Sequence, residues 1–504
     1  MKLNTKNLSQ LPERVQRPLY DRKQVKQGIV HIGVGGFHRA HQAIYTEMLL
    51  NRGKASEWGI CGVGLRSEDR AMQEALASQD YLYTLYELGD SDNSQIQVVG
   101  VLGDFLLAED GSEALIRKLA DPETRIVSLT ITEGGYCTDD SSGQFNADLP
   151  QIRHDLANPQ QPKTVFGFLT EALARRRAAG VKPFTVMSCD NLPHNGQVAR
   201  NALLSFAKLR DVGLHDWIAS NVSFPNAMVD RITPMTSDAH RSQLLEETGI
   251  EDAWPVVAEP FLQWVVEDNF CNGRPSWEEV GVQFTDDVTP YEEMKIRLLN
   301  GSHMAMAYLG ALLGHRYAHE AMQDAQLLEF VRAYMDRDVT PLLAEVPGID
   351  LENYKDTLIE RFSNTAICDQ ISRLCSDGSS KLPKFVLPSL LGQIEAGVDM
   401  RRTTLILAAW CHYLRGLDER GATYPILDPR AASLQETAGL KERLVESFLG
   451  LEDVFGHKIP ASATCVATFR LQLGRLQELG VRATLELTMA EEVGADERKF
   501  ATLA

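Results

Sequence analysis

The stretch that most constrains the fold is "GIVHIGVGG" (28–36), in which an apolar run ends in glycines. It predicts a buried strand that turns into a helix at "AHQAIYTEMLL" (40–50), and a second strand follows at "EWGICGVGLR" (57–66). Strands that alternate with helices at this spacing are typical of βαβ units around a parallel sheet. The N-terminal part of the chain is therefore expected to have an α/β fold.

The alternation continues to about residue 290 and then stops. We expect buried strands at "RIVSLTIT" (125–132) and "PFTVMSCD" (183–190), and the same sheet can be extended by "WIASNVSFP" (217–225) and "PVVAEPFLQWVVED" (255–268). From residue 291 onward, long amphipathic runs with helical periodicity dominate. The expected organisation is an α/β domain at 1–288 and a mainly helical domain at 289–504, joined near Pro290.

Composition excludes several classes of partner. The chain has 50 Lys plus Arg and 69 Asp plus Glu, which gives a net charge of −19. Such a field repels phosphate backbones and anionic lipids, so we expect no nucleic acid and no membrane partner. The N-terminus lacks the apolar core of a secretory signal, and no apolar run approaches the ~18 residues of a membrane span. A cytoplasmic protein is expected, and nothing in the sequence argues against a monomer.

Cysteine and histidine spacing gives no reason to expect a metal. The eight cysteines are scattered, with no C-x-x-C pair, as in proteins of a reducing compartment. The pairs His38/His41 and His315/His319 each offer two imidazoles, but no third ligand stands at a familiar spacing. No metal site is predicted.

The glycine turn can hold a dinucleotide. Gly33, Gly35 and Gly36 follow a strand and precede a helix, where a first glycine makes the tight turn and a second lets a pyrophosphate approach the helix N-terminus. A tight structural turn explains the same pattern equally well. After the next strand, Glu68 and Asp69 can accept hydrogen bonds from a ribose and would repel a 2′-phosphate, which favours NAD over NADP, although the neighbouring Arg66 could still meet a phosphate.

The segment "YEEMKIRLLNGSHMAMAYLGALLG" (291–314) predicts a helix with polar groups on one side. At ~100° per residue, with Lys295 at zero, Glu292 lies near 60°, His303 near 80° and Asn300 near 140°. The apolar Ile296 and Leu299 share this arc, so a surface pair of Glu292 with Lys295 remains an alternative interpretation.

Two further segments carry polar residues next to strands. In "TVMSCDNLPHNG", Asp190 and Asn191 stand just past a strand, at the edge where open α/β sheets bind ligands, but such residues also cap helices and turns. In "VSFPNAMVDRITP", Asp230 and Arg231 stand between prolines, and an internal ion pair is the simple interpretation.

Together these segments resemble a known family, the polyol-specific long-chain dehydrogenases, also called the mannitol dehydrogenase family. "VSFPNAMVDRITP" is similar to the family signature, and the resemblance extends in order through "GVGGFHRAH", "TEGGY", "SCDNLPHNG" and "KIRLLNGSH". It covers most of the chain. The resemblance implies an N-terminal Rossmann-type domain that binds NAD, a mainly helical C-terminal domain, and a metal-independent active site in the cleft between them.

The resemblance also assigns roles to individual residues. Lys295 is implied as the general base, Asn191 and Asn300 flank the reacting oxygen, and His303 helps to place the substrate. Asp230, Arg373 and Lys381 would contact the sugar chain, with Lys381 in a loop-like segment, "DGSSKLPK". The candidate cofactor contacts remain the glycine turn, including Phe37, and Arg66, Glu68 and Asp69 after the second strand. Glu292, one turn before Lys295, is a candidate proton relay.

These roles agree with the chemistry of alcohol oxidation. Without a metal, a side chain must accept the hydroxyl proton, and burial beside a cationic nicotinamide disfavours the ammonium form of a lysine. Amide donors can then stabilise the developing alkoxide. We therefore expect an enzyme that interconverts mannitol and fructose with NAD. The alternatives are a fructuronate or tagaturonate reductase or an arabinitol dehydrogenase of the same family, and, in a different class, a non-catalytic NAD sensor.

Overall fold

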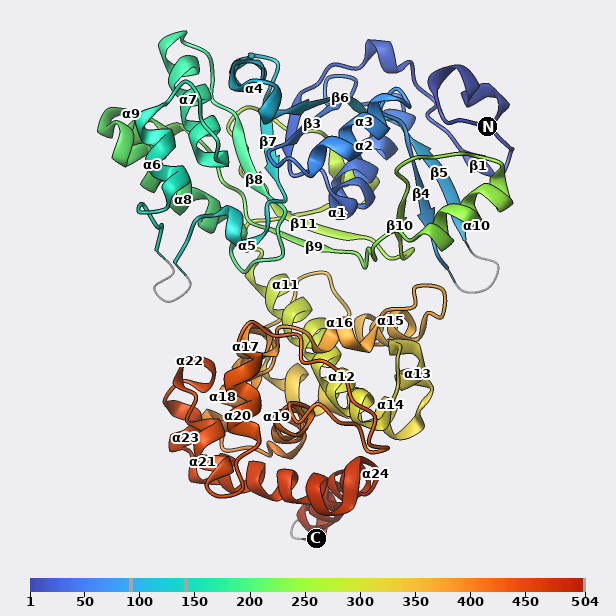
Figure 1. Cartoon of the computed structure of the whole chain (residues 1–504), viewed down its shortest axis with the longest axis vertical. Coiled ribbons are helices and arrows are strands. Elements are labelled where there is room, and N and C mark those ends of the chain that lie inside the picture. Colours follow the sequence, from blue (N-terminus) through green and yellow to red (C-terminus); the bar gives the residue numbers. More distant parts are fainter. Residues whose placement is uncertain (90–93, 140–143, 502–504) are drawn as a thin grey trace. The chain divides into compact units, whose positions relative to one another are not determined.

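The computed structural model describes residues 1–89, 94–139 and 144–501, and side chains up to residue 490 (Figure 1). By its internal contacts the chain divides into two compact units, Met1–Thr289 and Pro290–Ala504. The first unit contains all of the β-sheets that are found in the described residues, and the second is built from helices.

The first unit alternates strands and helices along the chain. Its strands are β1 (Val15–Gln16), β2 (Ile29–Ile32), β3 (Ile60–Gly64), β4 (Tyr83–Glu87), β5 (Gln95–Val99), β6 (Leu102–Leu107), β7 (Ile126–Leu129), β8 (Thr185–Ser188), β9 (Ala227–Asp230), β10 (Val256–Ala258), β11 (Gln263–Glu267) and β12 (Gln283–Thr285). Its helices are α1 (Gly36–Ala40), α2 (Gln42–Asn51), α3 (Asp69–Ala77), α4 (Ser112–Ala120), α5 (Thr132–Gly135), α6 (Pro150–Ala157), α7 (Val165–Ala178), α8 (Asn195–Arg210), α9 (Val212–Asn221) and α10 (Asp238–Thr248).

The central sheet has the order β6-β3-β2-β7-β8, and every pairing in it is parallel. Numbered by their place along the chain, these strands run 3-2-1-4-5, which is the order of a Rossmann fold. The direction of winding reverses between β2 and β7, where the first strand meets the fourth. In this order the crevice outside the carboxyl ends of the strands is the place where ligands bind. The predicted Rossmann-type architecture is confirmed.

Both faces of this sheet are buried. Ile29 of β2 belongs to one apolar core together with residues of α2, whereas Val30 belongs to a second core together with residues of α7 and α8. Successive side chains of a strand point to opposite faces, so each parallel strand is buried on both sides and mostly apolar. This explains why the strands were visible in the sequence as continuous apolar runs.

Two of the expected strands do not extend the central sheet. Most of the segment 217–225 was wrongly predicted, because Trp217–Asn221 completes helix α9, which begins where Asp211 accepts a hydrogen bond from the Leu214 N–H. The segment 255–268 does form strands, but β10 pairs with β4 in the sheet β1-β5-β4-β10, and β11 pairs with β9 and β12 in a third sheet. Local apolar content predicts a strand but does not identify its partners.

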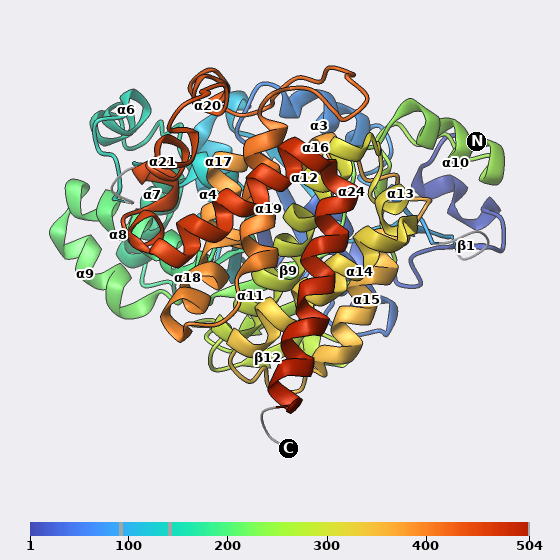
Figure 2. The same cartoon turned by 90° about the horizontal axis from the view of Figure 1, so that it is seen from below.

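The second unit is mainly helical, as expected. Its helices are α11 (Thr289–Met294), α12 (Gly301–Leu313), α13 (Ala318–Gln323), α14 (Ala325–Ala333), α15 (Leu351–Ser363), α16 (Ile371–Cys375), α17 (Gly378–Phe385), α18 (Leu387–Ala396), α19 (Arg401–Tyr413), α20 (Ala431–Ala438), α21 (Leu444–Leu449), α22 (Glu452–Phe455), α23 (Lys458–Ala461) and α24 (Ala463–Ala501). Helix α12 is buried along nearly its whole length and packs against α16 and α19, while α19 lies alongside α24 (Figure 2). In the part of the chain that the structure describes, no helix has the length and apolarity that crossing a bilayer requires.

Two predicted helices of this unit are interrupted. The segment 291–314 is α11, then the π-helix η5 (Lys295–Asn300), then α12. The run that begins at α14 likewise passes into the π-helix η6 (Tyr334–Val339) and the 3₁₀ turn η7 (Thr340–Leu342). A π-helix bonds each N–H to the carbonyl five residues back, so it carries an extra residue that apolar periodicity does not reveal. In α24, Gly480 has φ 81° and ψ 177°, which breaks the helix.

A carboxyl group is buried in the core of the first unit. The Glu47 side chain of α2 accepts hydrogen bonds at Oε2 from the Tyr20 hydroxyl, at 2.7 Å, and from the Gly100 N–H, at 3.0 Å. Burial nevertheless raises the pKa of Glu47 from 4.5 to about 7. Between these two pH values the folded chain holds a proton that the unfolded chain has lost, so the free energy of unfolding falls as pH rises, by about 3 kcal/mol in all.

We predict that Glu47→Gln removes this part of the pH dependence. The amide keeps an acceptor for Tyr20 and Gly100 but cannot ionise. Urea unfolding of both proteins from pH 5 to 8 should show the wild type losing stability relative to the variant up to about pH 7. A constant difference across this range would mean that Glu47 is already ionised in the fold at pH 5.

Candidate active site

The first glycine of the turn is required by the fold itself. Gly33 has φ +96°, and a Cβ atom there would lie 2.1 Å from the carbonyl oxygen of Thr130, just beyond β7. The Thr130 hydroxyl donates to the Gly33 carbonyl oxygen at 2.7 Å. The ends of β2 and β7 are thus joined at the point where the winding of the sheet reverses, which is where a dinucleotide binds in this fold.

The next glycines leave room for a ligand. A Cβ atom at Gly35 would meet its nearest neighbour, the Gly33 carbonyl oxygen, at 3.7 Å, and one at Gly36 would meet Thr233 Cγ2 at 3.5 Å. Gly35 caps α1, whose first N–H groups have no acceptors within the helix. Phe37 stacks on His41, with ring centroids 4.8 Å apart. An open backbone followed by unsatisfied donors fits a pyrophosphate group.

A buried histidine pair under this turn was not predicted. His31 of β2 lies within hydrogen-bonding distance of Ser128 Oγ, at 2.8 Å, and of Thr130 Oγ1, at 3.0 Å. The ring of His38 stacks on it with centroids 3.4 Å apart. Burial lowers the pKa of His31 to about 3 and the pKa of His38 in the same direction, so both rings are neutral. In the sequence, this pair could have been suspected only from His31, a polar residue inside an apolar strand.

The carboxylates after β3 differ in their availability. Asp69 accepts a hydrogen bond from the Arg66 N–H at 3.0 Å and lies 3.7 Å from the Arg66 guanidinium, so it shapes the turn between β3 and α3. Glu68 is exposed, as is Arg66. All three residues lie past the carboxyl end of β3, the neighbour of β2, and so at the same edge of the sheet as the glycine turn.

The pair Asp190–Asn191 lies at this edge too, past the end of β8. Asp190 is buried and accepts hydrogen bonds from the Ile131 N–H at 3.0 Å, the Thr132 N–H at 2.8 Å and the Tyr136 hydroxyl at 2.6 Å. It therefore holds the turn after β7, in which Thr132 has φ +60°. Asn191, next to it, is exposed. Asp190 was interpreted as a cap or turn residue, and it does bind the backbone of a turn. Asn191 lies on the surface of this unit.

The dipeptide Asp230–Arg231 is buried at the end of β9. Arg231 forms its ion pair with Glu87 and donates to the carbonyl oxygens of Glu259, at 2.9 Å, and Ala40, at 2.6 Å. Because Glu87 already balances the charge of Arg231, an ion pair between Asp230 and Arg231 is not needed for that purpose. Burial of Asp230 at the end of a strand is unusual for a carboxylate, so Asp230 stays a candidate site residue.

In the second unit, the helical segment α11–η5–α12 carries the polar residues that the sequence singled out. Glu292, Lys295 and His303 are each about 5% exposed, and Asn300 is half-buried. The His303 ring packs on Phe362 of α15 at a centroid distance of 4.6 Å. The Asn300 Oδ1 atom is buried with no hydrogen-bond partner among the described residues. A buried amide without a partner is expected where a ligand completes the site.

Arg373 and Lys381 lie together in this unit. Arg373 of α16 donates two hydrogen bonds to the Asp369 carboxylate, at 2.8 and 2.6 Å. Lys381 Nζ donates to the carbonyl oxygen of Arg373 at 3.2 Å and to Ser376 Oγ at 3.2 Å. Burial lowers the pKa of Lys381. The expected loop around Lys381 is in fact helix α17, so this lysine is held in place rather than mobile.

The histidine pairs considered as metal ligands have other contacts. His41 Nε2 lies 2.8 Å from the Gln263 carbonyl oxygen, and His315 lies 3.4 Å from Asp324. Across residues 1–89, 94–139 and 144–490, no three His, Cys, Asp or Glu side chains gather into a group that could hold a metal ion.

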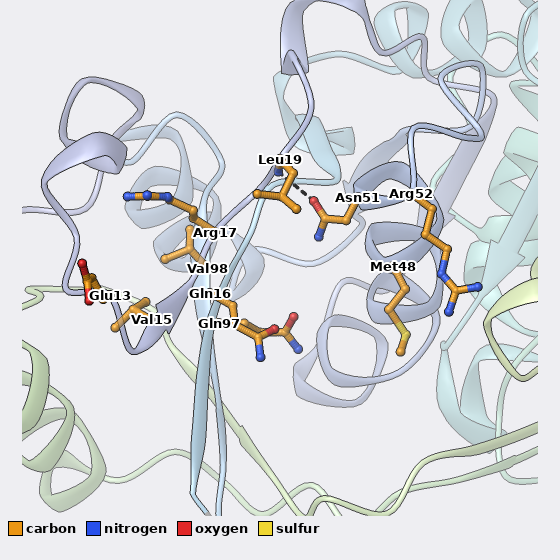
Figure 3. A pocket seen from close by; sticks show the side chains of 10 residues that line it. All are labelled: Glu13, Val15, Gln16, Arg17, Leu19, Met48, Asn51, Arg52, Gln97 and Val98. Carbon is orange, nitrogen blue, oxygen red and sulfur yellow. Dashed lines mark hydrogen bonds between the residues drawn. The ribbon is translucent and has the colours of Figure 1, made fainter.

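A separate hollow of about 500 Å³ lies on the first unit, between α2 and the strands β1 and β5 (Figure 3). Its lining is mostly aliphatic and amide side chains, among them Met48 and Gln97, and Asn51 accepts a hydrogen bond there from the Leu19 N–H at 2.8 Å. None of the predicted site residues lines it, and its one carboxylate, Glu13, has no partner acid or base for catalysis. We assign it no role.

Comparison with known proteins agrees with this geometry. The "Mannitol dehydrogenase Rossmann domain" family matches residues 27–279, and the "Mannitol dehydrogenase C-terminal domain" family matches residues 287–477. Mannitol 2-dehydrogenase of Phaeosphaeria nodorum is 48% identical over 96% of this chain and 85% of its own length, and that of Aspergillus fumigatus is 45% identical over 96% and 98%. The chain belongs to the mannitol dehydrogenase family.

Solved structures of this family share the fold. Pseudomonas fluorescens mannitol 2-dehydrogenase, in a ternary complex with NAD and D-mannitol, is 61% identical, with a TM-score of 0.88 over 97% of this chain and all of the other. A D-sorbitol dehydrogenase in its substrate-free form is 43% identical, with a TM-score of 0.90 over 96% of this chain and all of the other. This mannitol dehydrogenase family member therefore shares its fold with a mannitol 2-dehydrogenase and with a D-sorbitol dehydrogenase.

The glycine turn of this family member yields a paired prediction. Gly33→Ala should lower the free energy of unfolding by about 2 kcal/mol or more, because the added Cβ atom meets the Thr130 carbonyl and the backbone is left-handed. Gly35→Ala should unfold like the wild type but bind NADH at least ~10-fold more weakly, because its methyl group occupies the open approach. Urea unfolding and NADH fluorescence titration measure the two effects. Unchanged NADH affinity in Gly35→Ala would mean that the cofactor does not approach this turn.

Proposed function

We propose that this protein is an NAD-dependent, metal-independent polyol dehydrogenase that interconverts D-mannitol and D-fructose. One observation carries the proposal: 61% identity, over nearly all of both chains, to a mannitol 2-dehydrogenase that is described with NAD and D-mannitol bound. We infer that residues 1–288 form the NAD-binding domain and that residues 289–504 form the substrate-binding and catalytic domain. The free cysteines support a cytoplasmic location, and a monomer is the simplest state that we propose.

The first unit holds the cofactor in this proposal. Gly33, Gly35 and Gly36 with Phe37 form the cradle for the pyrophosphate. Glu68 and Asp69 accept hydrogen bonds from the adenosine ribose, and their charge favours NAD over NADP. Arg66 lies beside them, but Asp69 contacts its guanidinium and reduces its charge toward a phosphate. NAD⁺ held by these residues would supply the acceptor for the hydride that leaves the carbinol carbon of the substrate.

The second unit supplies the base. Lys295, nearly buried, accepts the proton of the reacting hydroxyl group as hydride leaves. Asn300 and Asn191 donate hydrogen bonds to the same oxygen, and they do so without competing for the proton because amides do not titrate in this range. His303, fixed against Phe362, directs the hydroxyl toward Lys295. Glu292, one helical turn before Lys295, passes the proton on toward solvent.

The substrate contacts favour a neutral polyol over a hexuronate. Arg373, which a carboxylate substrate would need, already forms a bidentate pair with Asp369, and Lys381 is engaged by carbonyl and hydroxyl oxygens. With Asp230 as a further acceptor, the three side chains offer hydrogen bonds to hydroxyl groups with little net charge. This supports mannitol over the fructuronate and tagaturonate reductase alternatives.

D-sorbitol is the second candidate substrate, because a D-sorbitol dehydrogenase shares this fold at 43% identity. Mannitol and sorbitol differ only in configuration at the carbon that is oxidised to give fructose. The rest of the substrate can therefore make the same contacts, and only the orientation of the hydroxyl group and the hydrogen on the reacting carbon differs. Arabinitol, which is one carbon shorter, would use a subset of these contacts.

A substrate panel tests the proposed reaction. We expect NADH formation from NAD⁺ with D-mannitol, weaker turnover with D-sorbitol and D-arabinitol, and little with mannonate or altronate, all unchanged by a chelator. Absorbance of the reduced nicotinamide measures each rate. Turnover restricted to the two aldonates would contradict the choice of substrate, and loss of activity on chelation would contradict the metal-independent mechanism. NADH binding without any turnover would favour the sensor.

Replacement of the base tests the mechanism. Lys295→Ala should lower kcat for mannitol by about 10²- to 10⁴-fold, the usual contribution of a general base, with NADH binding within ~2-fold of the wild type. Added primary amines should restore part of the rate, since they can take up the proton in the space that the side chain leaves. Lys384→Ala, on α17, is the matched control and should keep wild-type activity. Full activity of Lys295→Ala would exclude this lysine as the base.

A further inference from the structure

Two π-helices lie in contact in the second unit. η5 spans Lys295–Asn300 and thus begins and ends on residues to which we assign catalytic roles, and η6 spans Tyr334–Val339. π-Helical turns are rare, cost stability relative to an α-helix, and occur frequently at functional sites. Two of them packed together require a physical reason.

The π-helix changes where the polar side chains point. In a continuous α-helix, Glu292, Asn300 and His303 would spread over an arc of about 140° from Lys295. A π-helix turns by only ~82° per residue, so Asn300 comes to about 50° and His303 to about −10°, while Glu292 stays near 60°. The four side chains then share about 70° of one face. The π-turn is what gathers them.

Tyr334 of η6 packs on Gly301, the first residue after this π-turn. Gly301 follows Asn300 directly, and a Cβ atom there would lie 2.8 Å from Tyr334 Oη, 3.4 Å from its Cε1 and 3.1 Å from the Phe385 carbonyl oxygen. Tyr334 is completely buried. Its phenol group therefore occupies the space beside the Gly301 backbone, and the glycine is what lets the two helices approach so closely.

η6 has its own anchor. Asp338, in its last turn, accepts hydrogen bonds from Arg402 Nε of α19 and from Gln393 Nε2 of α18, the latter at 2.6 Å. The Thr340 hydroxyl donates to the Met335 carbonyl oxygen at 2.7 Å. Because η6 is fixed to α18 and α19, it can serve as a support against which η5 is held.

We propose that Tyr334 is a positioning residue that holds the π-turn Lys295–Asn300 in place through its contact with Gly301, and so sets the direction of the Lys295 and Asn300 side chains. The inference rests on the proposed function, in which these two residues act on the reacting oxygen. Tyr334 itself touches neither substrate nor cofactor in this account. It acts through the backbone of the turn.

Reciprocal substitutions test the contact. Gly301→Ala adds a methyl group against the Tyr334 hydroxyl, and Tyr334→Phe removes that hydroxyl and leaves a gap beside Gly301. Each single variant should lower kcat by about 10-fold and displace the pH profile of kcat, with the Kd for NADH unchanged. The double variant should come within ~3-fold of the wild type, because its methyl group fills the space that the hydroxyl leaves.

Gly310→Ala is the matched control on the same helix. Its Cβ atom would meet Ala321 and Ile371 at 3.5 Å, an ordinary contact, and its kcat should equal that of the wild type. Additive losses in the double variant, or single variants that lower the melting temperature without any change in kcat or its pH profile, would overturn the proposal. If Gly301→Ala does not fold, an unaltered pH profile in Tyr334→Phe overturns it alone.

Failure of the positioning role of Tyr334 can be distinguished from failure of the proposed function. Should Lys295→Ala keep full activity, the proposed base is wrong whatever the contact does. Should Lys295→Ala lose activity while the Gly301 and Tyr334 variants stay uncoupled, the base is retained and the positioning role of Tyr334 is rejected.

Discussion

The close approach of Gly33 to Thr130 is the constraint on which the first unit depends. It joins the ends of β2 and β7 at the point where the sheet reverses its winding, with no room for a side chain between them. The His31 ring bonds to both Ser128 and Thr130 beneath it, and Asp190 holds the next turn from the β8 side. The glycine turn thus rests on three neighbouring strands, and the flanking Gly35 is left free to face a ligand.

The second unit meets a different requirement, which is to keep ionisable and amide groups inside an apolar helix bundle. Burying a cation or an amide is costly unless it is hydrogen-bonded. The turn η5 carries both the nearly buried Lys295 and, within the described residues, the unpartnered Asn300 Oδ1 atom. Two other cationic side chains of this unit already have partners. Arg373 pairs with Asp369, and Lys381 donates to carbonyl oxygens of α16. If these residues form the site that we propose, its net charge is small, which suits a substrate made of hydroxyl groups.

Much of this could be predicted from the sequence. Strands β2, β3, β7 and β8 are buried on both faces, so their apolar runs were recognisable, and their alternation with helices determined the fold class.

Segment 217–225 was wrongly predicted because its aromatic and β-branched residues suit a strand, whereas the Asp211 cap starts a helix. The sheet partners of β10 and β11 depend on contacts far away in the chain. The π-turn at Lys295 could not be predicted, because hydrophobic periodicity assumes α-helical rotation. The burial of Asp190 and the exposure of its neighbour Asn191 could not be read from composition either.

The break in α24 at Gly480 has a consequence for how the helix melts. Helix formation is cooperative, so fraying that begins at a free end travels inward until something restarts the helix. Here Glu419 Oε1 accepts the Val481 N–H at 2.5 Å and acts as a new N-terminal cap, and the Glu419 N–H is itself bonded to the Leu312 carbonyl at the end of α12. Fraying from the C-terminus should therefore stop at Gly480. The residues of α24 before Gly480, among them Gln472, which donates to the Arg401 carbonyl oxygen of α19, are thus insulated from fraying that begins beyond Gly480.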